Sequence, residues 1–315
     1  TGSSSNGGAF QLDQATMLRR MKKASEPKEG SIAPCPGEVS AEGAPRRATR
    51  VIAITSGKGG VGKTNIAANL AYHLCRMKKK TLVLDADMGL ANIDVILGLA
   101  PKYNLYHVLK GEKALSDVIV EGPGGMQILP ATSGIPEMAD LSRGEKLALL
   151  DELDGLGREL DFMLIDTAAG IAGNVIYFNV AAREIIVVAS PEPTSITDAY
   201  ALIKILYSQH GEKRFMLLAN MVKNAGEARE VFLKVSNATS HFLNLSIESL
   251  GYVLDDARVT EAVRRQKALA EAFPDSRASK CLESIARKLC RLQPGPVESG
   301  SLKFFWKSIV EKPRG

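Results

Sequence analysis

The residues with the clearest chemical potential stand together in the decapeptide SGKGGVGKTN, at positions 56 to 65. It contains the full pattern GxxxxGK[ST], in which glycines let backbone N–H groups close around phosphate oxygens. In such a loop Lys63 reaches the β- and γ-phosphates, and Thr64 offers its hydroxyl to Mg²⁺. We therefore predict a nucleotide-binding loop; a glycine turn with a purely structural role is the weaker alternative. The predicted nucleotide contacts in this loop are Gly57, Gly59, Gly60, Val61, Gly62, Lys63, Thr64 and Asn65.

Three acidic residues follow two later apolar runs. Asp85 and Asp87 stand in DADMGLAN after the run TLVLD, and Asp166 opens DTAAG after DFMLI. Each could simply end a strand. Three carboxylates at adjacent strand ends beside a phosphate loop instead suit metal coordination and water positioning, because phosphoryl transfer depends mainly on placing the nucleophile and stabilising charge. The sequence thus predicts metal ligation by Thr64, Asp85 and Asp166.

The elements that must position these residues are short apolar runs alternating with helical patterns. Most runs are apolar throughout rather than alternating, which is typical of strands covered on both faces, and the segments between them are long enough for crossover helices. We predict a doubly wound, mostly parallel α/β domain spanning residues 50 to 293, with a helix from Asn65 to about Met77 and ligands at the carboxyl ends of the strands. The predicted strands are Val51–Thr55, Thr81–Asp85, Met126–Pro130, Asp161–Asp166, Glu184–Ser190, Arg214–Asn220 and Leu250–Leu254.

Composition bounds the class of protein. The 315 residues are 45% hydrophobic and 24% charged, which is typical of a globular chain. No run reaches the ~18 apolar residues of a membrane-spanning helix, and the first residues show no signal-peptide pattern, so we expect a cytoplasmic protein. The four cysteines form no CxxC pair, which favours reduced structural thiols. The net charge of +5 is concentrated at the two ends of the chain, and the body is balanced.

A second lysine in the loop, Lys58 in KGGVGKT, indicates the family. The segment resembles the deviant Walker A ATPases of the ParA/MinD family, in which this early lysine reaches the phosphates of a partner across a nucleotide-sandwich dimer. The resemblance implies that Lys58 acts in trans, as an arginine finger does, and that hydrolysis depends on dimerisation. It also implies that Asp87 orients the attacking water and that Lys63 remains the phosphate lysine of its own site.

The resemblance also implies which base is bound. Asn220 in LLANMVKN would contact adenine, and GYVLDD, which ends at Asp256, is similar to the late adenine-side loop of the family. No guanine-specific NKxD motif follows the sixth strand, so we expect ATP with Mg²⁺. The sequence departs from the family at two prolines, which are replaced by Ala168 and Leu254. Either change could alter loop rigidity and the hydrolysis rate.

The N-terminal region, residues 1 to 25, precedes a Pro/Gly/Glu-rich linker at residues 26 to 49. It contains an apolar stripe at helical spacing, which could be a weak helix docked on the body. Alternatively, it resembles the DQAxxLR motif of the flagellar-number branch of the MinD family (FlhG, FleN, YlxH), which binds the signal-recognition-type GTPase FlhF and stimulates its GTP hydrolysis. The residues that match this motif are Asp13, Gln14, Ala15, Leu18 and Arg19.

The C-terminal region, residues 294 to 315, holds the segment LKFFWKSIV after a short linker. Its apolar spacing fits a helix that packs on the core, and it equally fits an amphipathic helix in the headgroup region of an anionic membrane. We expect the second, because the linker makes the element detachable and a dimer would present two such helices. The predicted membrane residues are Leu302, Lys303, Phe305, Trp306, Lys307 and Ile309.

These patterns together predict a dimerising, MinD-like ATPase that regulates flagellar number or placement and resides reversibly on the inner face of the cell membrane. Its expected partners are a second copy of itself, an FlhF-type GTPase, and a flagellar switch or transcription-regulator protein. A DNA- or cargo-partitioning ATPase of the ParA type is one alternative, although the balanced body makes nucleic acid unexpected. A scaffold that binds ATP without significant turnover is the other.

Overall fold

The computed structural model describes residues 48–87, 93–130, 152, 155–156, 159–182, 184–292 and 305–307. The predicted N-terminal region and the linker up to residue 47, including Asp13, Gln14, Ala15, Leu18 and Arg19, lie outside the described residues. So do Leu302, Lys303 and Ile309 of the predicted membrane segment.

The core of the molecule is one eight-stranded sheet with the order β3-β4-β2-β5-β1-β6-β7-β8. Every neighbouring pair is parallel except β3 and β4 at one edge. The order reverses at β1, in the centre of the sheet, which is where a doubly wound fold places its ligand site. The strands are β1 (Arg50–Ser56), β2 (Thr81–Ala86), β3 (Val120–Glu121), β4 (Gln127–Pro130), β5 (Phe162–Ala169), β6 (Glu184–Ala189), β7 (Phe215–Val222) and β8 (Glu248–Leu254).

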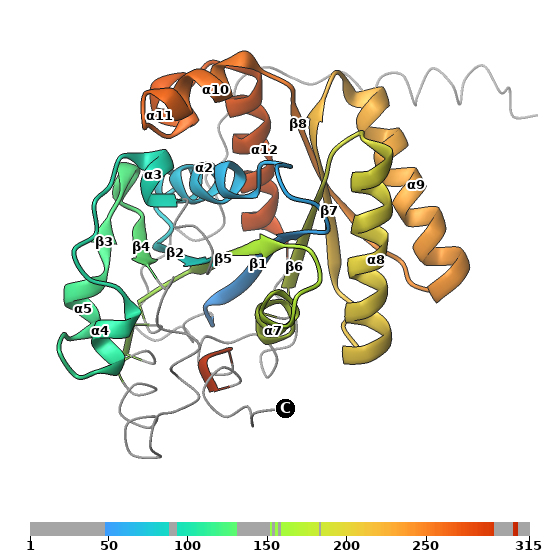
Figure 1. Ribbon diagram of the computed structural model, residues 1–315. Helices are drawn as coiled ribbons and strands as arrows, with labels where there is room; N and C mark the ends of the chain where they lie inside the picture. The colour runs from blue at the N-terminus through green and yellow to red at the C-terminus, as the bar shows by residue number, and fades with distance from the viewer. Residues whose placement is uncertain are drawn as a thin grey trace, which may run out of the picture. The chain divides into compact units, whose positions relative to one another are not determined.

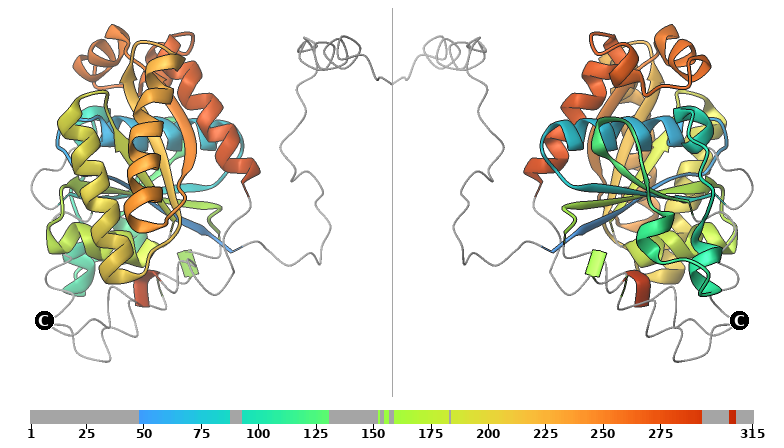
Figure 2. Two further views of the ribbon diagram at one scale, coloured as in Figure 1. Left: turned by 90° about the vertical axis from the view of Figure 1, so that its right-hand side faces the viewer. Right: turned by 90° about the vertical axis from the view of Figure 1, so that its left-hand side faces the viewer.

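Helices cover both faces of this sheet (Figure 1). The helix that follows β1 and the long helix before the C-terminal region lie on one face, whereas the helices after β5, β6 and β7 cover the other. The helices of the first face are α2 (Lys63–Arg76), α3 (Ile93–Leu97), α10 (Ala257–Arg264), α11 (Leu269–Ala272) and α12 (Arg277–Arg291). Those of the second face are α4 (Leu105–Leu109), α5 (Leu115–Val118), α7 (Gly173–Ala182), α8 (Pro193–His210) and α9 (Ala225–Leu243). Figure 2 shows α8 and α9 side by side over the β6–β8 half of the sheet.

The central strands are buried on both sides, as their continuous apolar runs predict. In β1, Ile52 and Ile54 contact the α2 and α12 layer, whereas Val51 and Ala53 contact the layer that contains α7. All four side chains are 0% exposed. This packing fixes the register of β1, so the loop that follows it leaves the sheet at a defined point.

The strand ends differ from the predicted ones by up to three residues, and two further details differ from the sequence predictions. Helix α2 begins at Lys63 rather than Asn65, so the phosphate lysine is already helical. Strand β3 was not predicted, because a two-residue antiparallel strand is too short for any period to show. Within the described residues no helix is long and apolar enough to cross a bilayer.

Candidate nucleotide-binding site

The glycine-rich loop connects the buried strand β1 to the first turn of α2. Gly62 precedes the helix with a φ of 89°, in the left-handed region that glycine adopts without strain. A Cβ at this position would lie 2.6 Å from Nδ2 of Asn220, so only glycine fits here without a steric clash. Neither a capping side chain nor an acidic first-turn residue occupies the start of α2, which leaves its N–H groups available to an anion.

Lys63 stands in this first turn and is 8% exposed. Burial lowers the pKa of its ammonium, and the carboxylates of Asp166 and Asp87 oppose the change. The structure thus brings the predicted phosphate lysine close to two of the three predicted acids. The two carboxylates thus compensate only part of the cost of burying the ammonium. A bound phosphate chain would add negative charge beside it and stabilise the charged form.

Asp85 and Asp166 are register partners on the neighbouring strands β2 and β5. Both are 1% exposed. Residues paired in this way point to the same face of a sheet. Val83 and Leu164, two positions earlier on that face, contact the α2 layer. The oxygens of Asp85 accept the N–H groups of Asp87 at 3.3 Å and Ile93 at 3.4 Å. Neither oxygen of Asp166 accepts a hydrogen bond of ordinary geometry.

The unpartnered carboxyl of Asp166 has a strongly shifted pKa. Burial raises the pKa of this group to about 7, and the nearby carboxylates of Asp85 and Asp87 add to the rise. Thr64 and Lys63 act in the opposite direction. A buried acid with so little compensation within the chain is a position where a cation would be stabilising.

The residues around this position fit Mg²⁺. Thr64 contributes a hydroxyl, and Asp85 and Asp166 contribute carboxylates, which are the hard oxygen donors that Mg²⁺ takes. No group of three or more His, Cys, Asp or Glu side chains forms a complete metal cage within the described residues. In nucleotide sites Mg²⁺ takes one or two carboxylates together with waters and phosphate oxygens, and the carboxylates of Asp85 and Asp166 fit that role.

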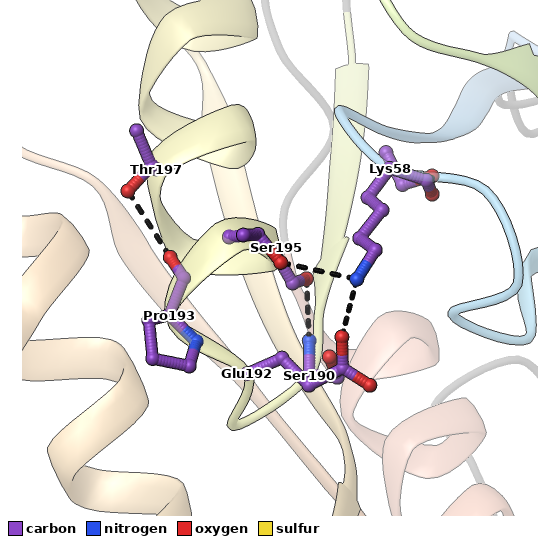
Figure 3. Close-up of polar contacts among 8 residues, drawn as sticks. Lys58, Ser190, Glu192, Pro193, Ser195 and Thr197 are labelled. Carbon is purple, nitrogen blue, oxygen red and sulfur yellow. Dashed lines mark hydrogen bonds and ion pairs between the residues drawn. The ribbon is translucent and has the colours of Figure 1, made fainter.

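Lys58 is engaged away from Lys63, at the beginning of α8. Its ammonium forms an ion pair with Glu192 and a 3.0 Å hydrogen bond with the hydroxyl of Thr194 (Figure 3). Both members of the ion pair remain partly exposed, with side-chain exposures of 37% for Lys58 and 62% for Glu192. The contact is therefore solvated and easily exchanged.

Hydrogen bonds within the chain hold the turn that contains Glu192. The hydroxyl of Ser195 accepts the N–H of Ser190 at 2.9 Å, and Thr197 donates to the carbonyl of Pro193 at 3.1 Å (Figure 3). Gly57 lies so close to the backbone of Asp198 that a Cβ would come within 2.2 Å of it. The start of the phosphate loop thus packs directly on the backbone of the first turns of α8.

Asn220 and Asp256, predicted to lie near the base, are engaged within the chain. The Nδ2 of Asn220 donates to the carbonyl of Val61 at 2.7 Å, which joins β7 to the phosphate loop. Asp256 accepts the N–H of Arg258 at 3.0 Å and that of Ala278 at 3.2 Å, so it caps α10 and holds the start of α12. Asn220 therefore braces the loop in addition to any contact with the base.

The two positions that depart from the family pattern have structural explanations. Ala168 lies within β5, which continues to Ala169 and pairs with Ser56 of β1. A proline at position 168 would place a residue without an N–H group in a central strand. Leu254 ends β8 and packs, partly buried, on the α8 and α9 layer. Asp87 ends the described part of this region, because residues 88–92 lie outside it.

The described part of the C-terminal segment is packed on the body. Phe305 and Trp306 are 0% and 1% exposed, and Phe305 stacks on Phe178 of α7 with ring centroids 6.4 Å apart. Lys307 is exposed. The membrane-facing arrangement that we expected for Phe305 and Trp306 is therefore not the one in this structure, because these two side chains pack in the layer that contains α7. The indole N–H of Trp306 is buried without a hydrogen-bond partner.

Sequence reasoning missed Glu192, Thr194 and the close approach of Asp198. The three residues lie more than 130 positions after Lys58 and belong to no motif with a chemical signature. Only the adjacency of β1 and β6 in the sheet brings them beside the loop.

The chain is similar to known proteins over most of its length. A family model described as an AAA domain matches residues 49–216. The antiactivator FleN of Pseudomonas aeruginosa is 44% identical over 264 residues, which is 84% of this chain and 94% of FleN. The flagellum site-determining protein YlxH of Helicobacter pylori is 37% identical, over 84% of this chain and 90% of that protein. The solved structure of the MinD cell division protein of Aquifex aeolicus superimposes with a TM-score of 0.62 at 27% identity, covering 78% of this chain and 99% of that one.

Proposed function

The chain belongs to the FleN/YlxH branch of the MinD/ParA family of P-loop ATPases, and from that premise we propose that it is an ATP-driven switch that regulates flagellar number or placement. The nucleotide site carries the first part of the proposal. The uncapped start of α2, the ammonium of Lys63 and the buried carboxyl of Asp166 fit the phosphates and the cation of a bound nucleotide. The similarity to YlxH, a flagellum site-determining protein, supports the flagellar part.

The residues of the site divide the work of ATP hydrolysis. The N–H groups at the start of α2 and the ammonium of Lys63 hold the phosphate chain. Thr64, Asp85 and Asp166 hold Mg²⁺, which when bound neutralises charge on the phosphate oxygens. Asp87 orients the attacking water for in-line displacement.

We propose that Lys58 completes the site of a second copy of the chain. In the single chain its ammonium is engaged by Glu192 and Thr194 at the start of α8. A homodimer with ATP between its subunits would draw this cation onto the partner's phosphates, where it would stabilise the leaving-group charge. Hydrolysis would then require two copies, and loss of the γ-phosphate would weaken the dimer.

The C-terminal segment supports a conditional membrane anchor. Phe305 and Trp306 are docked on the α7 layer, so their release would expose two large aromatic side chains next to Lys307. The unpaired indole N–H of Trp306 reduces the stability of the docked form, because a buried donor without an acceptor has lost its bond to water. We infer that the ATP-bound dimer releases two such segments onto an anionic membrane and that the monomer retains them.

The N-terminal region completes the proposal. Its DQAxxLR-like motif, at residues 13 to 19, would bind an FlhF-type GTPase and stimulate GTP hydrolysis there. A flagellar switch or transcription-regulator protein remains a possible partner of the ATPase body. The chain would thus be cytoplasmic and reversibly peripheral on the inner face of the membrane.

Flagellar counting tests the proposal in the cell. A strain lacking this protein would be complemented with the wild-type chain or with Lys63→Ala, which should not bind nucleotide productively. We expect the wild-type chain alone to restore the normal number of flagella per cell, as counted by electron microscopy. Equal restoration by Lys63→Ala would show that nucleotide turnover is not needed for the regulation.

A further inference from the structure

A groove of about 400 Å³ lies between α12 and β8, on the α2 side of the sheet and outside the nucleotide site. Within the described sheet β8 pairs only with β7, so its other edge is open along this groove. The lining is largely apolar and comes from both elements: Leu250 and Ile285 belong to the core on the α2 side, whereas Tyr252 and Leu254, at the edge of the sheet, also pack on the α8 and α9 layer. The apolar lining residues are Leu250, Tyr252, Leu254, Cys281 and Ile285.

The rim of the groove is basic. Arg277, Lys280 and Lys288 line it, and Ser284 stands between them at the same helical spacing, so these four exposed residues form one face of α12. None of the residues that line the groove is acidic. The partner of Lys280, Asp275, is 94% exposed, so their ion pair neutralises the rim only weakly.

The basic side chains already reach the backbone beside the open strand. The ammonium of Lys288 donates to the carbonyl of Ser249, and the guanidinium of Arg277 donates to the carbonyl of Asp255 at 3.3 Å. The first of these carbonyls belongs to β8 and the second follows it directly. The outer edge of β8 therefore has acceptor groups directed toward the groove, where exchangeable lysine and arginine contacts now satisfy them.

We propose that the groove between β8 and α12 is a docking site for an extended acidic segment of a partner protein, which would pair with the open edge of β8. Main-chain hydrogen bonds to the strand would supply affinity, as in other strand-addition complexes. Alternate side chains of the segment would contact the apolar floor, and acidic side chains on the other side would pair with Arg277, Lys280 and Lys288. A nucleic-acid duplex would leave the apolar floor uncovered and the strand edge unpaired. The proposal is independent of ATP hydrolysis and of the membrane segment.

The direct test is fluorescence anisotropy of a labelled nonapeptide in which Glu and Val alternate, titrated with the full-length chain. We expect saturable binding, weakened about tenfold or more by the double change Lys280→Glu and Lys288→Glu, since like charges would then face each other. The matched control is Lys204→Glu with Lys234→Glu, the same charge reversal on α8 and α9. It should change the affinity by less than about twofold, because these residues cover the opposite face.

Two further measurements separate strand addition from general attraction of anions. A peptide N-methylated at alternate residues, which cannot pair along one edge, should bind at least about tenfold more weakly. Alkylation of Cys281, followed residue by residue by mass spectrometry, should slow in the presence of the unmodified peptide, whereas Cys75 should react at an unchanged rate.

Four results would overturn the proposal. These are the absence of saturable peptide binding, equal weakening by the two double variants, equal binding of the N-methylated peptide, and displacement of the peptide by a short DNA duplex at lower concentration. ATPase activity should remain at the wild-type rate in the variants of the groove. Absence of peptide binding by a wild-type chain with normal ATPase activity would overturn this inference and leave the proposed function standing.

Discussion

Lys58 and Glu192 form an ion pair that ties the phosphate loop to the first turn of α8 in the single chain. Lys58 is the residue that the family resemblance assigns to the partner's active site, so its position here has a consequence for assembly. It must leave Glu192 and Thr194 before it can reach another copy. In the proposed dimer the ion pair would oppose assembly, although only weakly, because both side chains are partly solvated.

Replacement of this carboxylate should favour the dimer. In Glu192→Gln the charge that holds Lys58 is absent, and an exposed ion pair contributes up to about 1 kcal/mol. We expect the protein concentration that gives half-maximal specific ATPase activity to fall about two- to fivefold. The control is Glu230→Gln, at an exposed position of α9, which should leave the half-maximal protein concentration unchanged. An unchanged or higher half-maximal concentration in Glu192→Gln would show that the ion pair does not restrain Lys58.

The two glycines at the start of the loop should respond differently to alanine. At Gly57 a Cβ would meet the backbone of Asp198 at 2.2 Å, whereas at Gly59 it would meet nothing within 4 Å. Gly57→Ala should therefore lower the free energy of unfolding of the nucleotide-free chain by roughly 1–3 kcal/mol, as overpacking does. Gly59→Ala should change it by less than about 0.5 kcal/mol. Urea denaturation of both variants measures the difference, and equal values would contradict the close packing of loop and helix.

The buried carboxyl of Asp166 should make the metal-free chain pH-dependent. Its pKa is about 7 in the folded state, above the ordinary value of 3.8, so the folded chain binds more protons between these values than the unfolded chain does. Its contribution to stability is consequently present at low pH and lost as the pH rises from about 4 to about 7, by an amount on the order of 4 kcal/mol.

Asp166→Asn removes this titration. The free energy of unfolding of the variant, relative to wild type, should increase from pH 5 to pH 8 in chemical denaturation with EDTA present. A difference that is constant with pH would mean that the carboxyl is already ionised throughout. Addition of Mg²⁺ and ATP should restore the stability of the wild-type chain at pH 8 and not that of the variant.

Trp306 is the one tryptophan in the chain, so its emission reports directly on the C-terminal segment. Because the side chain is buried on the α7 layer, the nucleotide-free protein should emit at short wavelength. With ATP and vesicles containing about 30% anionic lipid, the protein should sediment with the vesicles, and a quencher placed in the acyl chains should reduce the emission.

A variant separates the anchor from the catalytic site. Trp306→Ser should lose most of the vesicle binding and keep its ATPase activity in solution, because the residue lies on the face opposite α2. If Trp306→Ser bound vesicles as well as the wild-type chain does, Trp306 would be a core residue only, and the proposal that it anchors the protein to membranes would be wrong.

The sequence predicted the strands and the phosphate site because both have local signals. A continuous apolar run such as VIAIT has few ways to be buried except as a central strand, and the glycine spacing reports the backbone geometry of the loop directly. The proximity of Asp85 and Asp166 was accessible for the same reason, since both acids lie toward the carboxyl ends of neighbouring parallel strands. By contrast, the contacts of Lys58 depend on which strand lies next to β1, a property of the topology that no short motif carries.

The docking of Phe305 and Trp306 could not be decided from the sequence. The same helical spacing of apolar residues serves a core-packing helix and a membrane-surface helix, because both place one apolar face out of water. What covers that face depends on the surface that α7 and Phe178 present. The local sequence pattern thus predicts that such a face is buried, but it does not predict whether the protein core or a membrane covers it.

Mixing two inactive variants tests the central claim, that Lys58 acts in the site of a second copy. Lys58→Ala keeps its own water-positioning Asp87, and Asp87→Asn keeps a Lys58 to donate, so a mixed dimer contains one complete site. Each variant alone should hydrolyse ATP at less than about a tenth of the wild-type rate, and an equal mixture should recover to about a quarter of it, because half of the dimers are mixed and each has one working site. A mixture no more active than the two variants measured separately would contradict action in trans and place Lys58 in its own subunit's chemistry.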